Sequence, residues 1–418
     1  MKLKIRGKKH IEGTVQISGA KNSAVAIIPA ATLTDEEVTL YNIPDISDVR
    51  AQINILNNHG YTATFSDNIL KISKNIKSRK LNTFLNDNVE SLRGSYYFIG
   101  SFLTRFKKIK IKSIGGCNLG PRPINYHLDA FKLMNARYNI TNDYIEISTR
   151  KLKGTKINLE YPSVGTTINI MIAGVLAKGT TIIKNAALEP EVIDLGNFLL
   201  RMGAKIEGIG TKTITIIGVK KLHGCDYTII SDRIEAATYL AIGAISEGNG
   251  VTVSNIDPSH LITVTDTLTK IGHKLQINND SITINKGENL SPINIETSPY
   301  PGFPTDLNPI FAVLLSQIQG ESSIKETVFL DRTSHINELN KMGASINTSN
   351  QITTITGTTE LKCNLLQAKD LRCAAALMIA SLLSRCTTTI ENIEYLLRGY
   401  EKPIEKLNCL NINARIEE

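Results

Sequence analysis

Six short segments of the chain share one pattern, in which a helix-like run ends at a Gly or Asn and a new strand begins. The end points lie 65 to 75 residues apart, at Gly60, Asn135, Gly203, Gly272, Gly343 and Asn408. Gly and Asn are the residues that most readily adopt the left-handed conformation just past a helix C-terminus. Six recurrences of one rule indicate a chain built from six repeats of about 70 residues.

Each repeat reads as strand, helix, strand, helix and a closing hairpin. The first helix is apolar nearly all round, as in SAVAIIPAATL from residue 23 and AAALMIASLL from residue 374, which predicts a helix buried inside a domain. The second helix is more amphipathic, so we expect it to cover a sheet from outside. The Thr/Ile alternation of segments such as INTSNQITTITG predicts half-buried strands.

Three such repeats can pack their buried helices into one core, so six repeats predict two α/β domains of similar size. We expect residues 21–231 to form one domain, and residues 1–20 with 232–418 to form the other. No Pro/Ser-rich linker separates them. This favours two tightly apposed domains with an active-site cleft between them.

The composition is that of an ordinary globular protein, with 42% hydrophobic and 21% charged residues among 418. No run of about 18 apolar residues predicts a membrane span, and MKLKIRGKKH lacks the apolar core of a signal peptide. The six cysteines include no CxxC pair. Their scatter favours reduced thiols in a cytoplasm, and argues against a disulfide framework and against structural zinc.

The net charge of +8 favours polyanionic ligands, either nucleic acid or phosphorylated metabolites. No basic tail, RGG tract or zinc-finger spacing supports nucleic acid, so a metabolite is the favoured ligand. No P-loop and no Gly-rich dinucleotide fingerprint after a strand is present. A nucleoside triphosphatase and a dehydrogenase are therefore disfavoured.

Loops that precede the predicted helices carry Gly or charge, where free backbone N–H groups suit phosphate and carboxylate. They include GAKN, ESLRG, GGCNLGPRP, PSVGTT, EPE, SDRIE, FPTD, DRTSH, KDLR and LLRGYEK. The basic residues of these loops are Lys21, Arg93, Arg122, Arg332, Arg372 and Arg398. Any one of them is explained by helix capping or a surface charge. The whole set favours an anion-binding site.

Two loop residues are candidates for proton chemistry. Cys117 lies in SIGGCNLGPRP, where three glycines predict a loop that is mobile or closely approached by a ligand. Neighbouring Arg122 and His127 would favour a reactive thiolate, and the alternative is a small apolar side chain in a turn. Asp306 of FPTD opens an apolar helix, so it is either an N-cap or a general base.

Taken together, these motifs resemble those of the enolpyruvyl transferases, and among them the bacterial UDP-N-acetylglucosamine 1-carboxyvinyltransferases. The matching segments are SGAKN at 18–22, GGCNLGPRP at 115–123, PSVGTT at 162–167, EPE at 189–191, SDRIE at 231–235, FPTD at 303–306, KDLR at 369–372 and RGYEK at 398–402. They span essentially the whole chain in order. The resemblance implies a two-domain inside-out α/β barrel of six repeats. Two positions depart from the family pattern, Asn125 in place of Asp and Tyr161 where some members have Lys.

The resemblance also implies a reaction, in which the enolpyruvyl group of phosphoenolpyruvate passes to the 3′-hydroxyl of UDP-N-acetylglucosamine and phosphate leaves through a tetrahedral adduct. Cys117 would protonate the methylene carbon, and Asp306 would take the proton of the sugar hydroxyl. The cations that would clamp phosphate and carboxylate are Lys21, Arg122, Arg372 and Arg398. Asn22 would hold the intermediate. The expected contacts to the nucleotide sugar are Arg93, Arg122, Pro123, Ile124, Asn125, Tyr126, Ser163, Val164, Gly165, Asp306 and Val328, with Arg332 as a further charge in the cleft.

On the same resemblance we expect no metal and no cofactor, a cytoplasmic enzyme of peptidoglycan synthesis, and no nucleic-acid or membrane partner. A monomer is favoured, and fosfomycin is expected to alkylate Cys117. Three alternatives stay open. A non-catalytic scaffold of the same fold is opposed by the complete charged set, and a nucleic-acid-processing protein rests on the basic isoelectric point alone. The sister enzyme that acts on shikimate 3-phosphate is opposed by the GGC loop.

Overall fold

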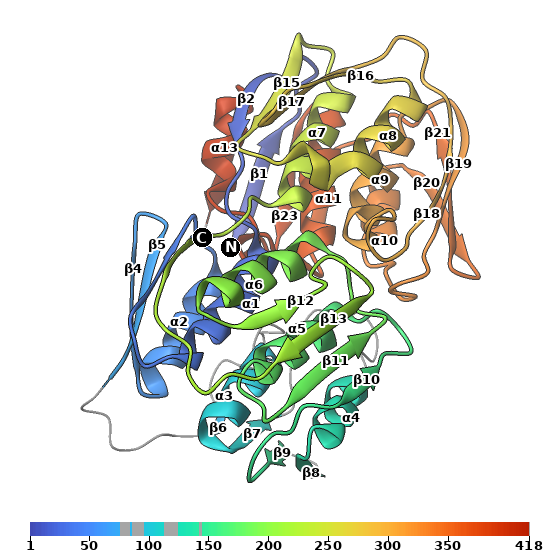
Figure 1. Cartoon of the computed structure of the whole chain (residues 1–418). Coiled ribbons are helices and arrows are strands. Elements are labelled where there is room, and N and C mark those ends of the chain that lie inside the picture. Colours follow the sequence, from blue (N-terminus) through green and yellow to red (C-terminus); the bar gives the residue numbers. More distant parts are fainter. Residues whose placement is uncertain (76–83, 86–95, 113–123, 142–143, 418) are drawn as a thin grey trace. The chain divides into compact units, whose positions relative to one another are not determined.

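The computed structural model describes residues 1–75, 84–85, 96–112, 124–141 and 144–417 (Figure 1). In this part of the chain two compact units are present. Unit 1 contains Met1–Ser18 and Ser231–Glu418, and unit 2 contains the described residues from Gly19 to Ile230. Within the described residues, the chain passes from one unit to the other after Ser18 and again after Ile230. None of the helices in the described ranges is long and apolar enough to cross a membrane.

The described strands of unit 1 form three four-stranded sheets. Their orders are β22 (Leu365–Gln367), β23 (Thr387–Glu391), β1 (Lys2–Arg6), β24 (Ala414–Glu417); β16 (Lys274–Ile277), β17 (Ser281–Asn285), β15 (Gly250–Ser254), β2 (Glu12–Gln16); and β18 (Asn294–Glu296), β19 (Gly320–Lys325), β21 (Ile352–Gly357), β20 (Ser345–Ser349).

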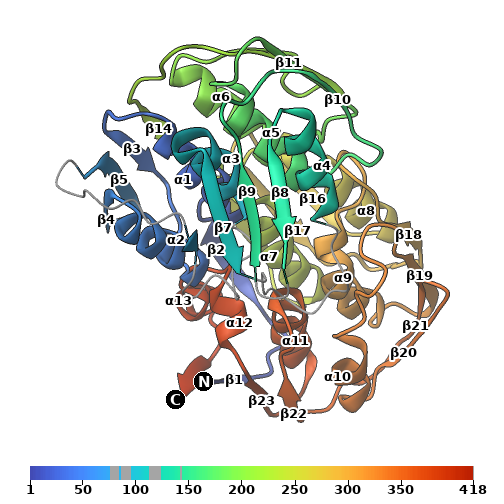
Figure 2. The ribbon, with the colours of Figure 1, turned by 90° about the horizontal axis from the view of Figure 1, so that it is seen from below.

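The described strands of unit 2 likewise form three four-stranded sheets. Their orders are β14 (Asp226–Thr228), β3 (Val38–Tyr41), β5 (Ile69–Lys74), β4 (Tyr61–Ser66); β6 (Phe84–Leu85), β7 (Lys108–Lys112), β9 (Tyr144–Ser148), β8 (Arg137–Ile140); and β10 (Lys156–Asn158), β11 (Thr180–Lys184), β13 (Thr213–Ile217), β12 (Lys205–Glu207). Strands β7, β9 and β8 lie side by side in Figure 2.

All six sheets share one pairing pattern, with one parallel pair and two antiparallel pairs. The strand that follows the first helix of each repeat always has a parallel partner on one side and an antiparallel partner on the other. These six strands are β3, β7, β11, β15, β19 and β23. The prediction of a half-buried strand is confirmed for β21. Thr353 and Ile355 on one face of this strand are buried, whereas Ile352 is exposed.

Each unit has a core of apolar helices that are buried on nearly all sides, as the sequence predicts. In unit 1 they are α7 (Arg233–Ile245), α9 (Asn308–Leu315) and α11 (Leu371–Leu383), and in unit 2 they are α1 (Lys21–Ala30), α3 (Tyr97–Phe106) and α5 (Val164–Gly174). Every residue of α9, and every residue of α7 from Ile234 onward, is buried. Helices α7, α9 and α11 pack against one another inside unit 1 (Figure 1). A helix without a polar face gains most free energy when it is enclosed in this way.

The second helix of each repeat is amphipathic, also as predicted. These helices are α2 (Ser47–Asn58), α4 (Asn125–Leu133), α6 (Pro190–Arg201), α8 (Ile262–Ile271), α10 (Ile336–Lys341) and α13 (Pro403–Cys409), and a short α12 (Glu394–Leu397) precedes the last. Each contacts an edge strand of a sheet, respectively β4, β8, β12, β16, β20 and β24. Their buried residues recur at helical spacing, as with Val192, Leu195 and Phe198 of α6.

Five of the six predicted helix ends are confirmed by positive φ angles, from 72° at Asn135 to 115° at Gly272. The sixth prediction, Asn408, is wrong. Helix α13 continues through Cys409, and Asn411 takes the left-handed conformation with φ 57°. Both positions are Asn, so residue type alone selected the wrong one.

A second recurrent Asn escaped the sequence analysis. Directly after the central strand of four sheets an Asn has positive φ, and its Nδ2 donates to a backbone carbonyl near the end of the strand paired in parallel. These residues are Asn42, Asn185, Asn255 and Asn392, and their acceptors belong to Ile229, Leu159, Ile17 and Ala368. After β19 the same position is occupied by Glu326.

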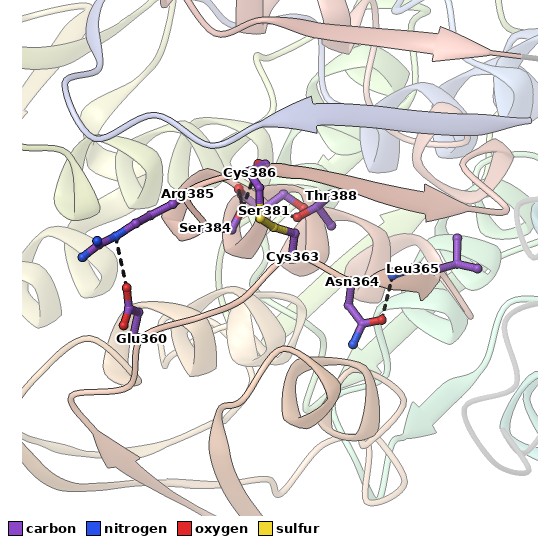
Figure 3. Close-up of a disulfide and its surroundings, with 9 residues drawn as sticks. All are labelled: Glu360, Cys363, Asn364, Leu365, Ser381, Ser384, Arg385, Cys386 and Thr388. Atoms are coloured by element: carbon purple, nitrogen blue, oxygen red, sulfur yellow. Dashed lines mark hydrogen bonds and ion pairs between the residues drawn. A yellow bond between two sulfur atoms is a disulfide. The ribbon is translucent and has the colours of Figure 1, made fainter.

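The expectation of reduced thiols throughout is wrong for one pair of cysteines. Cys363 and Cys386 form a disulfide with their Cα atoms 5.9 Å apart (Figure 3). They are 23 positions apart in sequence and meet because β22 and β23, which follow them, are paired in parallel. Of the other cysteines in the described ranges, Cys225, Cys373 and Cys409 are free thiols.

Candidate functional site

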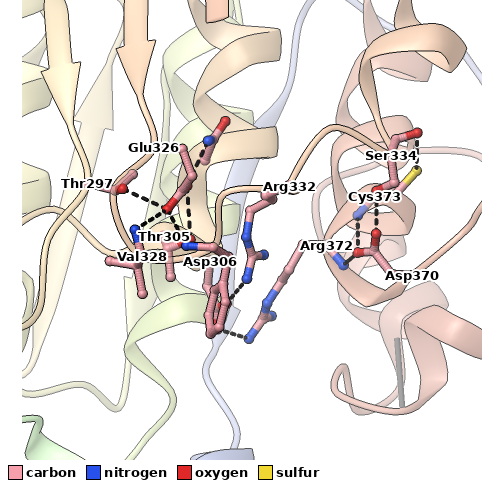
Figure 4. A network of polar contacts seen from close by, with 12 residues as sticks. Thr297, Thr305, Asp306, Glu326, Val328, Arg332, Ser334, Asp370, Arg372 and Cys373 are labelled. Atoms are coloured by element: carbon pink, nitrogen blue, oxygen red, sulfur yellow. Dashed lines mark hydrogen bonds and ion pairs between the residues drawn. The ribbon is translucent and has the colours of Figure 1, made fainter. Parts of the chain in front are cut away.

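Asp306 is held between two arginines in unit 1 (Figure 4). Its Oδ1 lies 3.0 Å from Nη2 of Arg332, and its Oδ2 lies 2.8 Å from Nη2 of Arg372. Asp306 lies in a 3-10 turn, Thr305–Leu307, that leads into buried helix α9. The N-cap residue of α9 is Leu307, so the capping interpretation of Asp306 is wrong. Its carboxylate is directed to the two guanidinium groups instead.

The two arginines are buried, whereas Asp306 keeps about a quarter of its side-chain surface exposed. Arg372 is the second residue of α11, so it lies in the first turn of a core helix instead of a loop. Burial acts to lower the pKa of Arg372, but the negative charge of Asp306 and other neighbours outweighs it, and the pKa is raised. The pair of arginines and one carboxylate therefore carries a net positive charge.

Arg332 has hydrogen-bonding capacity that the described protein atoms do not use. Its guanidinium lies 5.1 Å from the centre of the Phe329 ring, and only Nη2 reaches Asp306. Its Nε and Nη1 are buried without a hydrogen-bond partner among the described residues. Buried donors of a charged group are costly when unpaired. An anionic ligand beside Asp306 would satisfy them.

Glu326 organises the loops around Asp306. Its carboxylate is buried and accepts hydrogen bonds from Thr305 (3.0 Å) in the turn before α9, from Asn308 (2.9 Å), the first residue of α9, and from Thr297 (2.8 Å). It also accepts from the backbone N–H groups of Val328 and Phe329, both at 2.9 Å. One carboxylate thus fixes the turn before α9 and the segment 327–329. The sequence analysis missed Glu326, although its place after β19, where four other repeats have Asn, was a usable signal.

Asp370 fixes the start of α11 by hydrogen bonds, as Glu326 fixes the turn before α9. Its Oδ1 accepts from the backbone N–H groups of Arg372 at 2.8 Å and Cys373 at 3.0 Å, so it is a regular N-cap. Its other oxygen accepts from the Ser334 hydroxyl. The cap sets the direction of the first turn of α11, and with it the origin of the Arg372 side chain.

The first turn of α7 carries another buried charge of unit 1. Asp232 is the N-cap, and Glu235 of the SDRIE motif lies 2.6 Å from Nζ of Lys406. Glu235 also accepts from the backbone N–H of Ser18, where the chain leaves unit 1. Burial raises the pKa of Glu235 to about 7, and the charge of Lys406 offsets only part of that effect.

In unit 2, Lys21 and Asp48 form a largely buried ion pair, with Nζ 2.9 Å from Oδ2. Lys21 begins α1 and Asp48 lies in the first turn of α2, so the contact joins two helix N-termini. Asn22 follows Lys21 in α1. The carboxylate of Asp48 holds the lysine ammonium near the start of α1, where the helix dipole also favours an anionic ligand.

Two further predicted segments adjoin each other in unit 2. Ser163 caps α5 by accepting from the N–H of Thr166 at 3.3 Å, and a Cβ on Gly165 would approach the His127 ring to 3.2 Å. Asn169 Nδ2 lies 2.9 Å from Nδ1 of His127, and burial lowers the pKa of His127 to about 4. The histidine is therefore neutral near pH 7. A neutral ring carries no positive charge toward a nearby thiol, while Cys117 lies outside the described residues and its reactivity stays a prediction.

The remaining predicted residues are placed as follows. Ile124, Asn125 and Tyr126 lie at the start of α4, with Asn125 exposed; Val164 begins α5; Val328 is half-buried beside Glu326; and Arg398 is the C-cap of α12. Arg93, Cys117, Arg122 and Pro123 lie outside the described residues.

A cavity of about 300 Å³ in unit 1 does not coincide with these residues. It is lined by the C-terminal ends of the three core helices, including Ile245, Leu314 and Leu383. Asp306 and Arg372 lie at the N-terminal ends. Within the described ranges, no group of three or more His, Cys, Asp or Glu side chains is arranged to hold a metal ion.

The family model of EPSP synthase (3-phosphoshikimate 1-carboxyvinyltransferase) matches residues 5–407 of this chain. The chain belongs to this enolpyruvyl transferase family. Among curated proteins, it is 45% identical over 413 residues to UDP-N-acetylglucosamine 1-carboxyvinyltransferase 2 of Listeria monocytogenes serotype 4b, covering 99% of this chain and 97% of that protein.

Solved structures of the enolpyruvyl transferase family agree with the α/β fold. The enolpyruvyl transferase NikO from Streptomyces tendae superposes with a TM-score of 0.88 at 25% identity, over 99% of this chain and 98% of that one. EPSP synthase from Acinetobacter baumannii superposes with a TM-score of 0.75 at 18% identity, over 99% of this chain and the whole of that one. The second likeness speaks to the fold alone.

Proposed function

We propose that this protein transfers the enolpyruvyl group of phosphoenolpyruvate to the 3′-hydroxyl of UDP-N-acetylglucosamine and releases phosphate, the first committed step of peptidoglycan synthesis. The name of the relative that is 45% identical over nearly the full chain supports this acceptor. The observation that carries an anion site is Arg332, whose buried Nε and Nη1 lack partners beside Asp306 among the described residues. A substrate rich in phosphate or carboxylate oxygens supplies the acceptors that these donors need.

The reaction is an addition followed by an elimination. Cys117 donates a proton to the methylene carbon of phosphoenolpyruvate, and the sugar oxygen attacks the adjacent carbon as Asp306 takes the hydroxyl proton. The tetrahedral adduct then loses a methyl proton and phosphate, which restores the double bond. The cationic side chains that offset the charge of the phosphate and carboxylate are Lys21, Arg122, Arg332, Arg372 and Arg398.

The two ion pairs of Asp306 suit a base whose strength changes when substrate binds. Two guanidinium groups at 3.0 and 2.8 Å favour the ionised carboxylate, and they also weaken its affinity for a proton. An anionic substrate that recruits Arg332 or Arg372 would draw positive charge away from Asp306. The carboxylate would become the stronger base when the sugar hydroxyl is in place.

The nucleotide sugar would be bound by Arg93, the segment 122–126, the segment 163–165 and Val328, and Asn22 would hold the intermediate. The proposal includes the finer architecture of the family, an inside-out α/β barrel of six repeats in two domains. The shared strand pattern of the six sheets supports it. We further propose a monomer that works in the cytoplasm without metal or cofactor, and whose Cys117 is alkylated by fosfomycin.

Shikimate 3-phosphate is the second candidate acceptor, because the matching family model is named for the enzyme that uses it. Phosphate release from phosphoenolpyruvate, measured with each acceptor in turn, separates the two. We expect release with UDP-N-acetylglucosamine and none above background with shikimate 3-phosphate. The reverse result would assign the sister activity, and release with neither would overturn the enzymatic proposal.

A further inference from the structure

The disulfide between Cys363 and Cys386 lies where small thiol reagents can reach it. Cys386, in the turn between α11 and β23, is exposed, and Cys363, in the loop before β22, is half-buried (Figure 3). Their Cα separation of 5.9 Å is in the middle of the range that unstrained backbones offer to a disulfide. Backbone geometry therefore favours the bond without any movement of the two segments.

The bond closes a segment that includes one of the candidate site residues. Between the two cysteines lie strand β22, the N-cap Asp370, Arg372 and the whole of α11. Cys363 precedes this segment and Cys386 follows it, so the disulfide joins its two ends. Formation of the disulfide therefore restricts local unfolding of α11, the helix that carries Arg372.

The two joined segments lead directly into β22 and β23, which pair in parallel, and the side-chain contact between the segments themselves is weak. Glu360 and Arg385 form an ion pair at 3.1 Å, but their side chains are 65% and 77% exposed, and such pairs contribute little to stability. The same two segments also wall the cavity of about 300 Å³, so solid packing does not hold them together there. The disulfide adds a covalent link beside the β22–β23 pairing.

Two of the other described cysteines are poorly suited to thiol exchange. Burial raises the pKa of Cys225 to about 11 and that of Cys373 to about 12, which keeps both protonated near pH 7. Since the thiolate is the reacting form, neither competes well with an exposed thiol. Cys409 is exposed and free, and it provides a matched control.

We propose that Cys363 and Cys386 are a reversible thiol-modification site, oxidised by small-molecule disulfides and reduced by small-molecule thiols, that stabilises the Arg372-bearing segment when oxidised. The thiolate of Cys386 attacks a sulfur of the small disulfide and releases one thiol, which leaves a mixed disulfide. The thiolate of Cys363 then attacks the Cys386 sulfur and releases the second thiol. Two protein thiols and one small disulfide thus give one protein disulfide and two small thiols.

The test compares the full-length protein after treatment with oxidised glutathione and after treatment with dithiothreitol. We expect peptide mapping to recover the Cys363–Cys386 link only from the oxidised sample. The melting temperature of the oxidised form should be higher by about 6–12 °C, as a loop of this length in a domain of this size implies. Backbone amides of α11 should exchange hydrogen more slowly in the oxidised form.

C363S and C386S should each abolish the redox-dependent shift, and C409S should retain it. Absence of the linked peptide, or equal melting temperatures of the oxidised and reduced wild-type protein, would overturn the proposal. The wild-type comparison needs no variant, so poor folding of a serine variant does not obscure the result. None of these readouts uses enolpyruvyl transfer, and failure of the proposed function would leave them unaffected.

Discussion

Arg372 and Asp306 are 66 positions apart in sequence, and a 2.8 Å contact from Nη2 to Oδ2 joins them at the start of two core helices of unit 1. Arg332 completes the arrangement from the other side of the carboxylate. The contact concentrates charge at the N-terminal ends of α9 and α11, where backbone N–H groups also favour anions.

Asp306→Asn removes the proposed base and keeps the shape of the side chain. We expect kcat to fall by about 10²–10⁴-fold, because the hydroxyl proton loses its acceptor. The free energy of unfolding should fall by about 1–3 kcal/mol, since two buried arginines lose a charged partner. Steady-state kinetics and chemical denaturation measure the two effects. Asp280→Asn, at an exposed turn of the same unit, should change neither, and an unaltered kcat for D306N would remove Asp306 from the mechanism.

Glu326→Gln tests the carboxylate that connects the loops. An amide presents a donor where the carboxylate has an acceptor, so some of the five donors that meet Glu326 lose their bond. We expect a loss of about 1–3 kcal/mol in unfolding free energy, with a higher KM for the nucleotide sugar. Glu321→Gln is the matched control, because Glu321 is an exposed residue of β19. Equal stability of the two variants would contradict the assigned role.

Asp48→Asn tests whether the acidic partner of Lys21 positions it. The lysine keeps its charge but loses a buried carboxylate 2.9 Å away. We expect the KM for phosphoenolpyruvate to rise about tenfold, equivalent to about 1.4 kcal/mol of binding. Asp45→Asn is the comparison, because the exposed Asp45 pairs with Arg50. If both variants bind phosphoenolpyruvate equally well, the ion pair is structural only.

The raised pKa of Glu235 predicts that the free energy of unfolding depends on pH. Its pKa is raised from an ordinary 4.5 to about 7, so the folded state binds more protons than the unfolded state between these values. The stabilisation from this group is complete below pH 4.5 and is lost as pH rises through 7. Glu235→Gln should abolish that loss, which amounts to about 1–3 kcal/mol. Denaturation curves at pH 5 and pH 8 test this, and an unchanged difference between the two pH values in E235Q would contradict the raised pKa.

Local patterns predicted the regular elements well because each depends on nearby residues. The apolar helix from residue 374 lies within α11, and Gly203 and Gly343 end helices with positive φ. Asn408 failed because two Asn residues compete within four positions, and the choice between them depends on how far α13 packs against β24.

Long-range contacts were harder to predict than elements. Asp306 and Arg372 were both recognised as candidates, but no local pattern reveals that they form an ion pair. Cys363 and Cys386 meet only because two strands pair in parallel. Glu326 and Asp48 were missed because buried carboxylates have no spacing rule of their own. They are recognised when their donors, which come from distant loops, are known.

The most direct test of the central claim is identification of the product formed from phosphoenolpyruvate and UDP-N-acetylglucosamine, by mass spectrometry and nuclear magnetic resonance. We predict a UDP-sugar with an enolpyruvyl ether on its 3′ oxygen, formed by the wild-type protein and greatly reduced with Cys117→Ser. An unmodified nucleotide sugar after prolonged incubation of the folded wild-type protein would contradict the account. The same modification on shikimate 3-phosphate alone would contradict the acceptor.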